Sequence, residues 1–482
     1  MLDSRLKMCA EAVSGEGVAC DVGTDHAYLA SELILSGKCN HVIASDVAEK
    51  PLEFARNTVE KYNISDKVDL ILSDGLKEVP SDNVTDVVIA GMGAETIIHI
   101  LEDVEWIKKG VRLILQPMTK SPLLRKWLYA NGYKITEEKA VRDGKFIYTV
   151  ITSEYCGDTV KLTEFASIIG HLDFSFDISK EYLEYQINKL DKIAEGLENS
   201  RNIEESLKVK KVRRTLAIIL DFDTLTGEEI YNVLNEFYPF STQEKWDNSG
   251  YLVGNKGKLV RKILLSLDIT KSAILEAKNQ ECEMIISHHP VIFEPLKNIN
   301  SDSVVFKLIR DNISAICMHT NLDIAEDGTN GVIIHKLAEE YDFSCEPFEE
   351  LGNGLSLGMI CTLEERASAL IFGIVLKEIF NCEVVRCSNT ENSVKRFAVC
   401  SGSGGSMLDL AIAKGCDTLI TGDIKHDVWI SANNQNFTLF DCGHFNTENL
   451  VLEHLKNVLE ANFPFIETTI AKTSTDPVNY II

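Results

Sequence analysis

The sequence predicts an α/β protein in which a helical hairpin separates two sections of alternating strands and helices. Three observations predict this arrangement. Residues 1–160 alternate short apolar runs with amphipathic stretches, residues 161–222 carry apolar residues at spacings of three and four, and residues 226–482 return to alternating runs. Strands that alternate with helices form a parallel sheet with helices on both faces.

The first section contains five expected strands, each ending at a polar or glycine-containing turn. They are GVACDVG, HVIASD, VDLILSD, DVVIAGMG and VRLILQP, at residues 17–23, 41–46, 68–74, 86–93 and 111–117. Between them lie amphipathic stretches such as AEKPLEFARNTVEKYN at residues 48–63. The periodicity of that stretch is typical of a helix.

The middle section predicts two antiparallel helices. Residues Leu183, Ile187 and Ala194 share one helical periodicity, and Val212, Leu216 and Ile219 share a second. The segment NSRNIEES between them supplies turn and capping residues. The second helix carries five cations, which would ordinarily form a solvated face: Lys208, Lys210, Lys211, Arg213 and Arg214.

The last section begins near Thr226, which with Glu229 fits a helix-starting capping box despite Gly227. Seven strands are expected after it. They are KILLSLDI, CEMIISHH, SAICMHTNLD, LSLGMICTL, RFAVCSG, DTLITGD and FTLFDCGH. The glycine-rich segment SGSGGS at residues 401–406 has two readings, a phosphate-binding loop or a plain turn from strand to helix.

Composition restricts the function classes. The chain has 482 residues and a net charge of −25, of which −8 falls in residues 1–222 and −17 in the remainder, so the second half is an unlikely binder of polyanions. No signal peptide and no run of about 20 apolar residues is found. Thirteen cysteines without paired spacing predict reduced, mostly buried thiols in a cytoplasmic protein that does not enter a membrane.

Acidic residues at three successive strand ends predict a cofactor site in the first section. Asp21 and Gly23 end the first strand, Asp46 ends the second, and Asp74 with Gly75 ends the third. Carboxylates there would repel a pyrophosphate but attract a sulfonium and an ammonium group, which favours S-adenosylmethionine over a dinucleotide. Asp46 suits the two hydroxyls of a ribose.

The segments DVGTDHAYLA, ASDVAEKPLEFARNTV, LSDGL, VIAGMGAETI and LQPMTKSPLLRKWLYANGYKI resemble the bacterial tRNA adenine-N1 methyltransferases that act at tRNA position 22. The resemblance covers residues 1–222 and implies a Rossmann-like methyltransferase domain at 1–160 and a tRNA-contacting hairpin at 161–222. It implies that the cofactor is held by Asp21, Gly23, Thr24, Asp25, His26, Asp46, Asp74 and Gly75. The chain departs from the family pattern at Ala30 and Ala94, where the family usually has proline and glycine.

The expected chemistry is methylation of a base nitrogen. Adenine N1 lies on the pairing edge, so the base must be unpaired or swung out. The product is cationic, and Asp25 is the candidate that stabilises its charge. The resemblance implies that Gly91, Met92 and Gly93 form the floor under the base. No D/N-P-P-Y tetrad follows the fourth strand, which argues against the exocyclic amine. Expected phosphate contacts are Arg5, Lys120, Arg125, Lys126 and the five hairpin cations; methylation of a small molecule is the alternative.

Metal-type residues gather at strand ends in the last section. His288 and His289 follow an apolar strand and precede Pro290; an isolated pair of this kind is ordinarily one buried and one exposed histidine. Asp323 lies near another strand end, and His444 with Glu448 would share one helix face. The five residues suit two divalent ions, such as Zn, Mn or Fe, bridged by a carboxylate, with one histidine of the pair on each ion.

The segments EKWDNSGYLVG, SHHPVIF, HTNLDIAEDGTN, SGSGGS, TGDIKHD, CGHFNTE and TSTDPVNYI resemble the GTP cyclohydrolase I type 2 homologues, the NGG-interacting-factor-like dinuclear metal proteins. The resemblance spans about 226–482 and implies a two-lobed α/β domain with His288, His289, Asp323, His444 and Glu448 as ligands. It implies that His319, Asp423 and His426 line the cavity and that the chain forms homo-oligomers. The reaction stays open between GTP ring opening, another hydrolysis, and a metal-binding scaffold without turnover.

Overall fold

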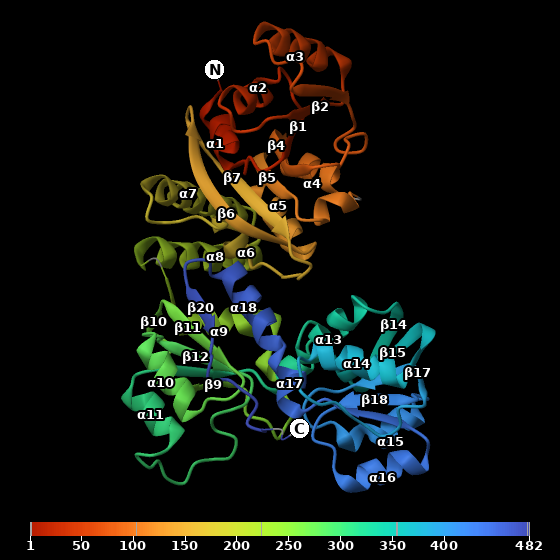
Figure 1. Ribbon diagram of the computed structural model, residues 1–482. Coiled ribbons are helices and arrows are strands. Elements are labelled where there is room, and N and C mark those ends of the chain that lie inside the picture. Colours follow the sequence, from red (N-terminus) through yellow and green to blue (C-terminus); the bar gives the residue numbers. More distant parts are fainter. Residues whose placement is uncertain (1, 103, 223, 353–354, 480, 482) are drawn as a thin grey trace. The chain divides into compact units, whose positions relative to one another are not determined.

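The computed structural model describes residues 2–102, 104–222, 224–352, 355–479 and 481, and the chain divides into two compact units. Unit 1 comprises Met1–Leu225 and Asn457–Phe465, and unit 2 comprises Thr226–Lys456 and Ile466–Ile482. The hairpin expected at residues 161–222 is therefore part of unit 1, and a short segment from within 226–482 groups with unit 1 as well. Figure 1 shows the elements of each unit.

Unit 1 is built on a seven-stranded sheet with the order β3-β2-β1-β4-β5-β7-β6. The five strands β1 to β5 are parallel, β7 is antiparallel to β5, and β6 is antiparallel to β7. The strands are β1 (Val18–Val22), β2 (Val42–Asp46), β3 (Val68–Leu72), β4 (Val84–Gly93), β5 (Arg112–Thr119), β6 (Tyr133–Asp143) and β7 (Phe146–Tyr155). The α/β class and the first five strands agree with the sequence prediction.

The β6–β7 hairpin was not expected from the sequence. Strand β6 mixes buried residues such as Ile135 with exposed charges at Glu137 and Lys139. Antiparallel strands near a sheet edge can leave part of one face in water, so β6 lacks the continuous apolar run that marks a central parallel strand. The tip of this hairpin nevertheless contributes to a cleft described below.

Two groups of helices cover the unit 1 sheet. Helices α1, α2 and α3 share one hydrophobic cluster with Ala19, Val42 and Val88 of the strands, whereas α4 and α5 contact each other outside that cluster. The bounds are α1 (Ser4–Ala12), α2 (Tyr28–Leu35), α3 (Glu49–Lys61), α4 (Ala94–Leu101), the 3₁₀ turn η1 (Glu105–Lys108) and α5 (Ser121–Ala130). The sheet is therefore covered as a doubly wound sheet requires.

The helical hairpin follows the sheet. It consists of α6 (Glu164–Ile169), α7 (Asp177–Asn199) and α8 (Ile203–Phe222), and α7 packs along α8. The expected turn residues lie between Asn199 and Ile203. Leu183, Ile187 and Ala194 are buried on α7, as predicted from their spacing, and Leu216 and Ile219 are buried on α8.

Unit 2 contains two larger sheets, in agreement with the two-lobed prediction. The first has the order β20-β11-β12-β13-β9 and the second has the order β14-β15-β17-β18-β19-β16. Their strands are β9 (Gly250–Val253), β11 (Lys262–Ser266), β12 (Met284–Ser287), β13 (Ser314–Cys317), β20 (Glu467–Ile470), and β14 (Phe343–Gly352), β15 (Leu355–Ser368), β16 (Arg386–Cys387), β17 (Ser393–Val399), β18 (Thr418–Thr421), β19 (Thr438–Asp441). Short strands β8 (Leu225–Thr226) and β10 (Leu259–Val260) pair separately.

Helices connect these strands. They are α9 (Gly227–Phe237), η2 (Phe240–Thr242), α10 (Lys271–Asn279), α11 (Val304–Arg310), α12 (Thr320–Asp323), α13 (Thr329–Ala338), α14 (Ala369–Ile379), η3 (Gly405–Met407), α15 (Leu408–Ala413), α16 (His426–Asn434), α17 (His444–Asn449) and α18 (Val451–Asn462). The capping box at Thr226 and Glu229 is confirmed. None of the described helices combines the length and the apolar character needed to cross a bilayer. All thirteen cysteines are free, and most are buried.

Candidate functional sites

The metal-type residues of unit 2 meet where parallel strands of both sheets end. His288 and His289 follow β12 and His319 follows β13 in the first sheet, while His444 follows β19 in the second. Ligands of open α/β sheets bind beyond the carboxyl ends of the strands, and here two such edges supply one cluster. Asp323 on α12 and Glu448 on α17 complete it. The structure therefore brings together all five residues singled out as ligands from the sequence.

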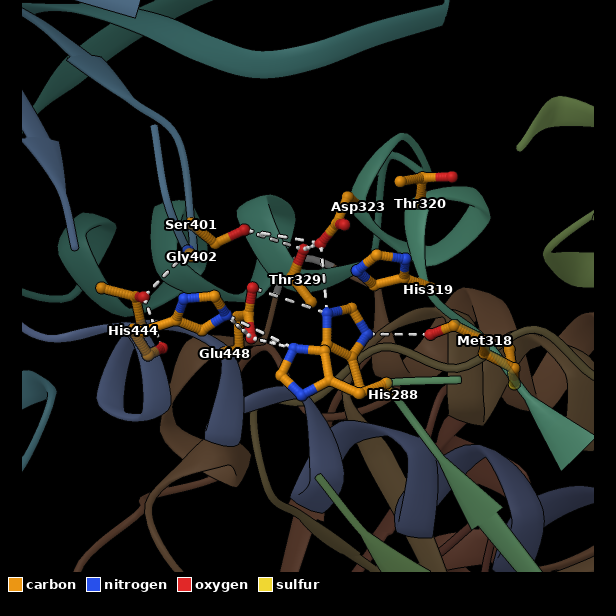
Figure 2. Close-up of polar contacts among 12 residues, drawn as sticks. His288, Met318, His319, Thr320, Asp323, Thr329, Ser401, Gly402, His444 and Glu448 are labelled. Atoms are coloured by element: carbon orange, nitrogen blue, oxygen red, sulfur yellow. Dashed lines mark hydrogen bonds and ion pairs between the residues drawn. The ribbon is translucent and has the colours of Figure 1, made fainter. Parts of the chain in front are cut away.

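Glu448 is the centre of the cluster. One carboxylate oxygen lies 3.7 Å from Nε2 of His288, and the other lies 3.0 Å from Nε2 of His289 and 3.1 Å from Nε2 of His444. Asp323 Oδ1 lies 3.6 Å from Nε2 of His288. Three groups of three potential ligand atoms result. Two of them, His288–Asp323–Glu448 and His289–His444–Glu448, share Glu448, and the third joins His288, His289 and His319. Figure 2 shows the carboxylates of Asp323 and Glu448 both directed toward the His288 ring.

Each histidine of the cluster is held by its Nδ1 atom. The Nδ1 of His288 lies 2.8 Å from the Met318 carbonyl oxygen, which can only accept, so this nitrogen carries the proton. The Nδ1 atoms of His289, His444 and His319 lie 2.9, 2.8 and 2.8 Å from carboxylates of Asp268, Asp423 and Asp247. Such outer partners are typical of metal-ligating histidines because they fix the ring and the tautomer.

Asp268 and Asp247 were missed as functional residues in the sequence. Asp268 follows the end of β11, so the same signal that identified Asp46 or Asp323, an acidic residue after an apolar strand, was present. Asp247 lies in an irregular segment after η2, where no periodicity marks it. Its pKa is held well below the usual range because hydrogen bonds to His319 and Thr320 outweigh the effect of burial.

The Asp323 carboxylate is fixed by hydroxyl groups. Thr329 donates a 2.5 Å hydrogen bond to Asp323 Oδ1, and Ser401 lies 3.2 Å from the Thr329 hydroxyl (Figure 2). Gly402 lies against Glu448, because a Cβ added at this glycine would come within 2.2 Å of Glu448 Oε1 and its φ is +64°. The glycine-rich segment 401–406 therefore makes room for the bridging carboxylate.

Three backbone donors of the same segment are bonded within the protein. The backbone N–H of Ser401 donates to Asn330, that of Gly402 donates to Thr447 and that of Gly404 donates to Thr421. Since these three donors are already bonded within the protein, they are not available to an anion. The helix after the segment, α15, is also short.

The carboxylates and imidazoles of the cluster stabilise each other's charged forms. Burial lowers the pKa of His289, but contacts with Asp268 and Glu448 outweigh it and raise the pKa to about 10. The contact with Glu448 raises the pKa of His444 to about 9, and the nearby imidazoles hold the pKa of the buried Glu448 far below its usual range. Burial raises the pKa of Asp323. The carboxylates of the cluster therefore stabilise positive charge at the imidazole groups, and this set of donors suits a divalent cation.

The Nε2 atom of His288 shows whether a metal ion fits the cluster. His288 is fully buried, and its Nε2 has no hydrogen-bond partner among the described residues although it points at two carboxylates. An unpaired buried lone pair is costly, and a divalent ion would satisfy it. The donors are imidazole nitrogens and carboxylate oxygens without cysteine, which suits Zn, Mn or Fe in a bridged pair.

A cavity of about 570 Å³ opens beside His289 and His444. Asp423 lines it, as implied by the resemblance, together with Asp268, Asp441, Asp476 and Arg386. His319 lies within the cluster of imidazoles instead. His426 is exposed at the start of α16 and lies outside both the cluster and the described lining of the cavity, so its implied place there is corrected.

The expected cofactor residues of unit 1 lie at the carboxyl ends of adjacent strands. Asp21 is at the end of β1, Asp46 at the end of β2, and Asp74 follows β3, in the spatial order β3-β2-β1. Asp21 is buried and accepts a 2.7 Å hydrogen bond from the Thr24 hydroxyl, whereas Asp74 is exposed beside Lys77. The three carboxylates thus share one sheet edge, where a cofactor with a ribose and an ammonium group fits.

Gly23 allows close approach to this edge. Its φ is +78°, and an added Cβ would come within 2.0 Å of the Met92 methyl group. The backbone N–H groups of Gly23 and Thr24 donate to the Ser45 carbonyl at 2.8 and 2.9 Å, so they hold β1 to β2 and do not point to a ligand. Because Gly23 has no side chain, the turn has room beside Met92 and stays open to a ligand on that side.

Asp25 and His26 lie on the surface of the turn. The Asp25 side chain is 75% exposed and lies 3.4 Å from Nε2 of His26. Water therefore screens its charge, which weakens its expected role as stabiliser of a cationic product. The His26 ring stacks on Tyr28 at 5.2 Å and lies 5.0 Å from the Phe54 ring.

The expected floor at Gly91–Met92–Gly93 is held by a hydrogen bond to the side chain of Gln116. The Gly91 N–H donates to Gln116 Oε1 at 3.1 Å, and Arg5 donates to the same oxygen at 3.0 Å. Arg5 also bonds Asp3 and Asp143, and its side chain is only 15% exposed. The expectation that Arg5 contacts phosphate is therefore corrected: this arginine supports the floor. Gln116, fully buried, was missed because nothing in its sequence context marks it.

Arg125 is also not a phosphate contact. Its side chain and that of Glu138 are 0% exposed, and they form a 2.6 Å ion pair. Arg125 additionally donates to the carbonyl oxygens of Ser167 and Ile168. Burial lowers the pKa of Arg125, but the charge of Glu138 outweighs burial and raises it. The sequence alone does not show whether an arginine on a helix is buried or exposed, because that depends on a partner such as Glu138 that lies elsewhere in the chain.

The remaining expected phosphate contacts are on the surface of unit 1. Lys120 pairs with Glu95 and Lys126 with Glu164, while Lys208, Lys210 and Arg213 pair with acidic residues of the hairpin. Lys211 and Arg214 are exposed and make no ion pair within the described ranges. Exposed ion pairs contribute about 0–1 kcal/mol, so a phosphate can displace them.

We expect Arg125→Met to destabilise unit 1 by about 3–5 kcal/mol because it leaves Glu138 buried without a counter-charge. The double variant Arg125→Met/Glu138→Leu is expected to lose less, since both charges are removed. Equilibrium urea denaturation, read by pulsed hydrogen exchange of peptides from α5 and β6, measures the change. A single variant as stable as the parent would contradict the buried ion pair.

Burial raises the pKa of Asp21 to about 6, although the Thr24 bond acts against it. Because the folded pKa exceeds the usual value of 3.8, this group favours folding at low pH and that contribution is lost as the pH rises through 6. In cofactor-free protein we expect Asp21→Asn to raise the free energy of unfolding of unit 1 by up to about 3 kcal/mol at pH 7.5 and by little at pH 4. Urea denaturation at both values tests this; an equal effect at both would contradict it.

Comparisons with known proteins give one family match for each half of the chain. The family model described as Duf34/NIF3 (NGG1p interacting factor 3) matches residues 225–477, and the model described as a methyltransferase domain matches residues 2–151. The chain is 31% identical over 230 residues to a GTP cyclohydrolase 1 type 2 homolog of Clostridium acetobutylicum, which covers 47% of this chain and 86% of that protein. It is 32% identical over 257 residues to a homolog of the same description from Campylobacter jejuni, covering 52% and 98%.

One solved structure is similar to part of the chain. It is M. capricolum TrmK in complex with S-adenosyl-homocysteine, with 28% identity, a TM-score of 0.40, and coverage of 45% of this chain and 99% of that one.

Proposed function

We propose, from the premise that this chain belongs to the Duf34/NIF3 (NGG1p interacting factor 3) family and carries a methyltransferase domain before that region, that it joins two enzyme activities. Unit 1 methylates N1 of the adenine at position 22 of tRNA with S-adenosylmethionine. Unit 2 holds two divalent metal ions and hydrolyses a nucleotide such as GTP. The observation that carries the first assignment is the row of Asp21, Asp46 and Asp74 at one sheet edge; the second rests on Glu448 between three histidines.

In unit 1 the residues bind and orient. Bound S-adenosylmethionine supplies the methyl group. Asp46 accepts hydrogen bonds from the ribose hydroxyls, and Asp21 with Thr24 faces the charged end of the cofactor. Gly91–Met92–Gly93, fixed through Gln116, presents the base so that the N1 lone pair faces the methyl carbon. N1 needs no prior loss of a proton, which explains why a strong general base is not required at this floor.

In unit 2 the residues form a preorganised ligand set. His288, Asp323 and Glu448 would hold one ion, and His289, His444 and Glu448 would hold the other. Two ions held there would supply Lewis-acid chemistry, polarising a carbonyl or phosphoryl oxygen and neutralising developing negative charge. Asp268 and Asp423 fix the rings of His289 and His444, so that each Nε2 would be available to an ion.

Methylation is tested with unmodified tRNA transcripts. The full-length protein, tRNA and labelled S-adenosylmethionine are incubated, the tRNA is digested, and the nucleosides are identified by mass and retention. We expect 1-methyladenosine, and we expect none from a transcript with guanine at position 22. Transfer to a free nucleoside with no transfer to tRNA would favour the small-molecule alternative, and N6-methyladenosine would overturn the N1 assignment.

The second activity is tested by metal analysis of the intact protein coupled to a screen of nucleoside triphosphates for metal-dependent hydrolysis. We expect two ions per chain and turnover that a chelator removes. Protein that contains two ions but hydrolyses no nucleotide in the screen would remove the hydrolase assignment and leave a metal-binding scaffold.

A further inference from the structure

A second cleft, of about 510 Å³, lies within unit 1. One wall is the end of β5 and the start of α5, with Met118 and Lys120. Another wall is the tip of the β6–β7 hairpin, with Phe146 and Tyr148. The third is one face of α7, where Tyr185 and Lys189 are four residues apart and project on the same side. We call this feature the aromatic cleft.

The aromatic cleft adjoins the expected methyl-transfer floor. In the sheet, Met92 is paired with Pro117 and Gly93 with Thr119, and both partners line the cleft. Arg5, which braces the floor through Gln116, also donates to the Met118 sulfur at 2.9 Å and lies 5.5 Å from the centre of the Tyr148 ring. A group held in the aromatic cleft is thus next to Gly91–Met92–Gly93.

Exposed rings give the cleft an affinity for planar ligands. Tyr185 is 52% exposed and Phe146 is 48% exposed, and the ring centres of Phe146 and Tyr148 lie 6.1 Å apart. Large exposed aromatic side chains around one concave surface are uncommon without a ligand. Single-stranded nucleic acids bind such surfaces by stacking bases on the rings while cations contact the phosphates.

The charge of the cleft fits a polyanion. The chain has 73 acidic and 48 basic residues, yet none of the described lining residues of the aromatic cleft carries a carboxylate, and two are lysines. The cavity of unit 2 has four aspartates and one arginine in its lining. Lys189 makes no ion pair among residues that the structure describes, and Lys120 has only the exposed partner Glu95.

We propose that the aromatic cleft binds the unpaired target nucleotide of the substrate RNA, with its base against Tyr148, Phe146 and Tyr185 and its phosphates toward Lys189 and Lys120. This inference rests on the proposed methylation of tRNA and specifies where the extruded adenosine is held. A cleft of this volume is large enough for one nucleotide and is within the usual range for ligand sites.

The test uses four variants of the full-length protein at Tyr185 and Lys189 together with two matched controls. Tyr185→Phe keeps the ring, Tyr185→Leu keeps only apolar volume, Tyr185→Ala removes both, and Lys189→Glu reverses the charge. The controls are Tyr62→Ala, an exposed ring outside the cleft, and Lys192→Glu, an exposed cation of the same helix. Three quantities are measured: kcat/KM for tRNA methylation, Kd for S-adenosylmethionine, and the fluorescence of tRNA carrying 2-aminopurine at position 22.

We expect Tyr185→Ala, Tyr185→Leu and Lys189→Glu to lower kcat/KM about 10- to 100-fold, as the loss of one stacked base or one phosphate contact does, with cofactor Kd unchanged. Tyr185→Phe and both controls should stay within about 2-fold of the parent. The fluorescence change on binding should require a ring at position 185. Parent-like methylation and fluorescence in Tyr185→Ala, or equal behaviour of Tyr185→Leu and Tyr185→Phe, would overturn the inference.

The experiment distinguishes a failure of the proposed methylation from a failure of the cleft assignment. In one outcome, the parent protein binds the 2-aminopurine tRNA with a fluorescence change that depends on Tyr185 and yet transfers no methyl group to the unmodified transcript. In that case the methylation assignment is wrong and the cleft assignment stands. If the tRNA does not bind, or if a Tyr185-dependent transfer goes to free adenosine only, the RNA nucleotide is not the occupant and the inference is wrong.

Discussion

Replacing Glu448 with glutamine is expected to remove both metal ions from unit 2. Glu448 is the one residue common to the two sets of three ligands, with oxygens 3.0 to 3.7 Å from the Nε2 atoms of His289, His444 and His288. Glutamine has the same length but loses the negative charge and offers one acceptor oxygen, so it cannot bridge two cations. Metal content, measured by mass spectrometry on gel-filtered protein, should fall from two ions per chain to nearly none.

Other ligand variants should give a graded result. His444→Ala removes a ligand from one set only, and Asp323→Asn weakens the other set, so each variant should keep about one ion per chain. Glu453→Gln, at an exposed glutamate on α18, is the matched control and should keep both ions. A Glu448→Gln protein that retains two ions, or a His444→Ala protein that loses both, would contradict the bridged arrangement.

Replacing Asp46 with alanine is expected to weaken the binding of S-adenosylmethionine about 100-fold. Asp46 ends β2, between β3 and β1, and one of its oxygens already accepts a 2.9 Å hydrogen bond from the Ala48 N–H, which fixes the carboxylate. Two hydrogen bonds from ribose hydroxyls to a charged group contribute about 3 kcal/mol together, which corresponds to about 100-fold in Kd. Calorimetric titration with S-adenosylmethionine and S-adenosylhomocysteine measures the loss.

The same variant separates binding from chemistry. Since Asp46 is proposed to contact the ribose and not the methyl group, its removal should raise the KM for the cofactor and leave kcat within a few-fold of the parent. Asp82→Asn, at an exposed aspartate in the same unit, is the control and should behave as the parent. An unchanged Kd for both ligands in Asp46→Ala would show that the ribose lies elsewhere.

Local sequence patterns predicted the elements that carry the sites. Five apolar runs became the parallel strands of unit 1, and the acidic residues that end them lie at one sheet edge because parallel strands end on the same side. Thr226 and Glu229 form the predicted capping box. The spacing of His444 and Glu448 placed both on one face of α17. These features depend on neighbours within a few residues, which the sequence displays directly.

Only the tertiary structure decided which charged residues are buried and which atoms they face. Arg125 and Lys126 are adjacent in the sequence, yet Arg125 is buried against Glu138 and Lys126 is on the surface, because the helix turns one into the core and the other into water. Arg5 likewise proved to be bonded to Gln116, which also holds the Gly91 backbone, and the β6–β7 hairpin was not predicted from the sequence.

The amino-acid sequence by itself determined the α/β class, the strand ends and the five candidate ligands, since each follows from short-range periodicity and residue chemistry. The tertiary structure alone decided that Glu448 is shared between two ligand sets, that Asp268 and Asp247 orient histidines, and that the glycine-rich segment packs against a carboxylate. The physical reason is that these contacts join residues far apart in the chain, and their distances are set by the packing of whole strands and helices.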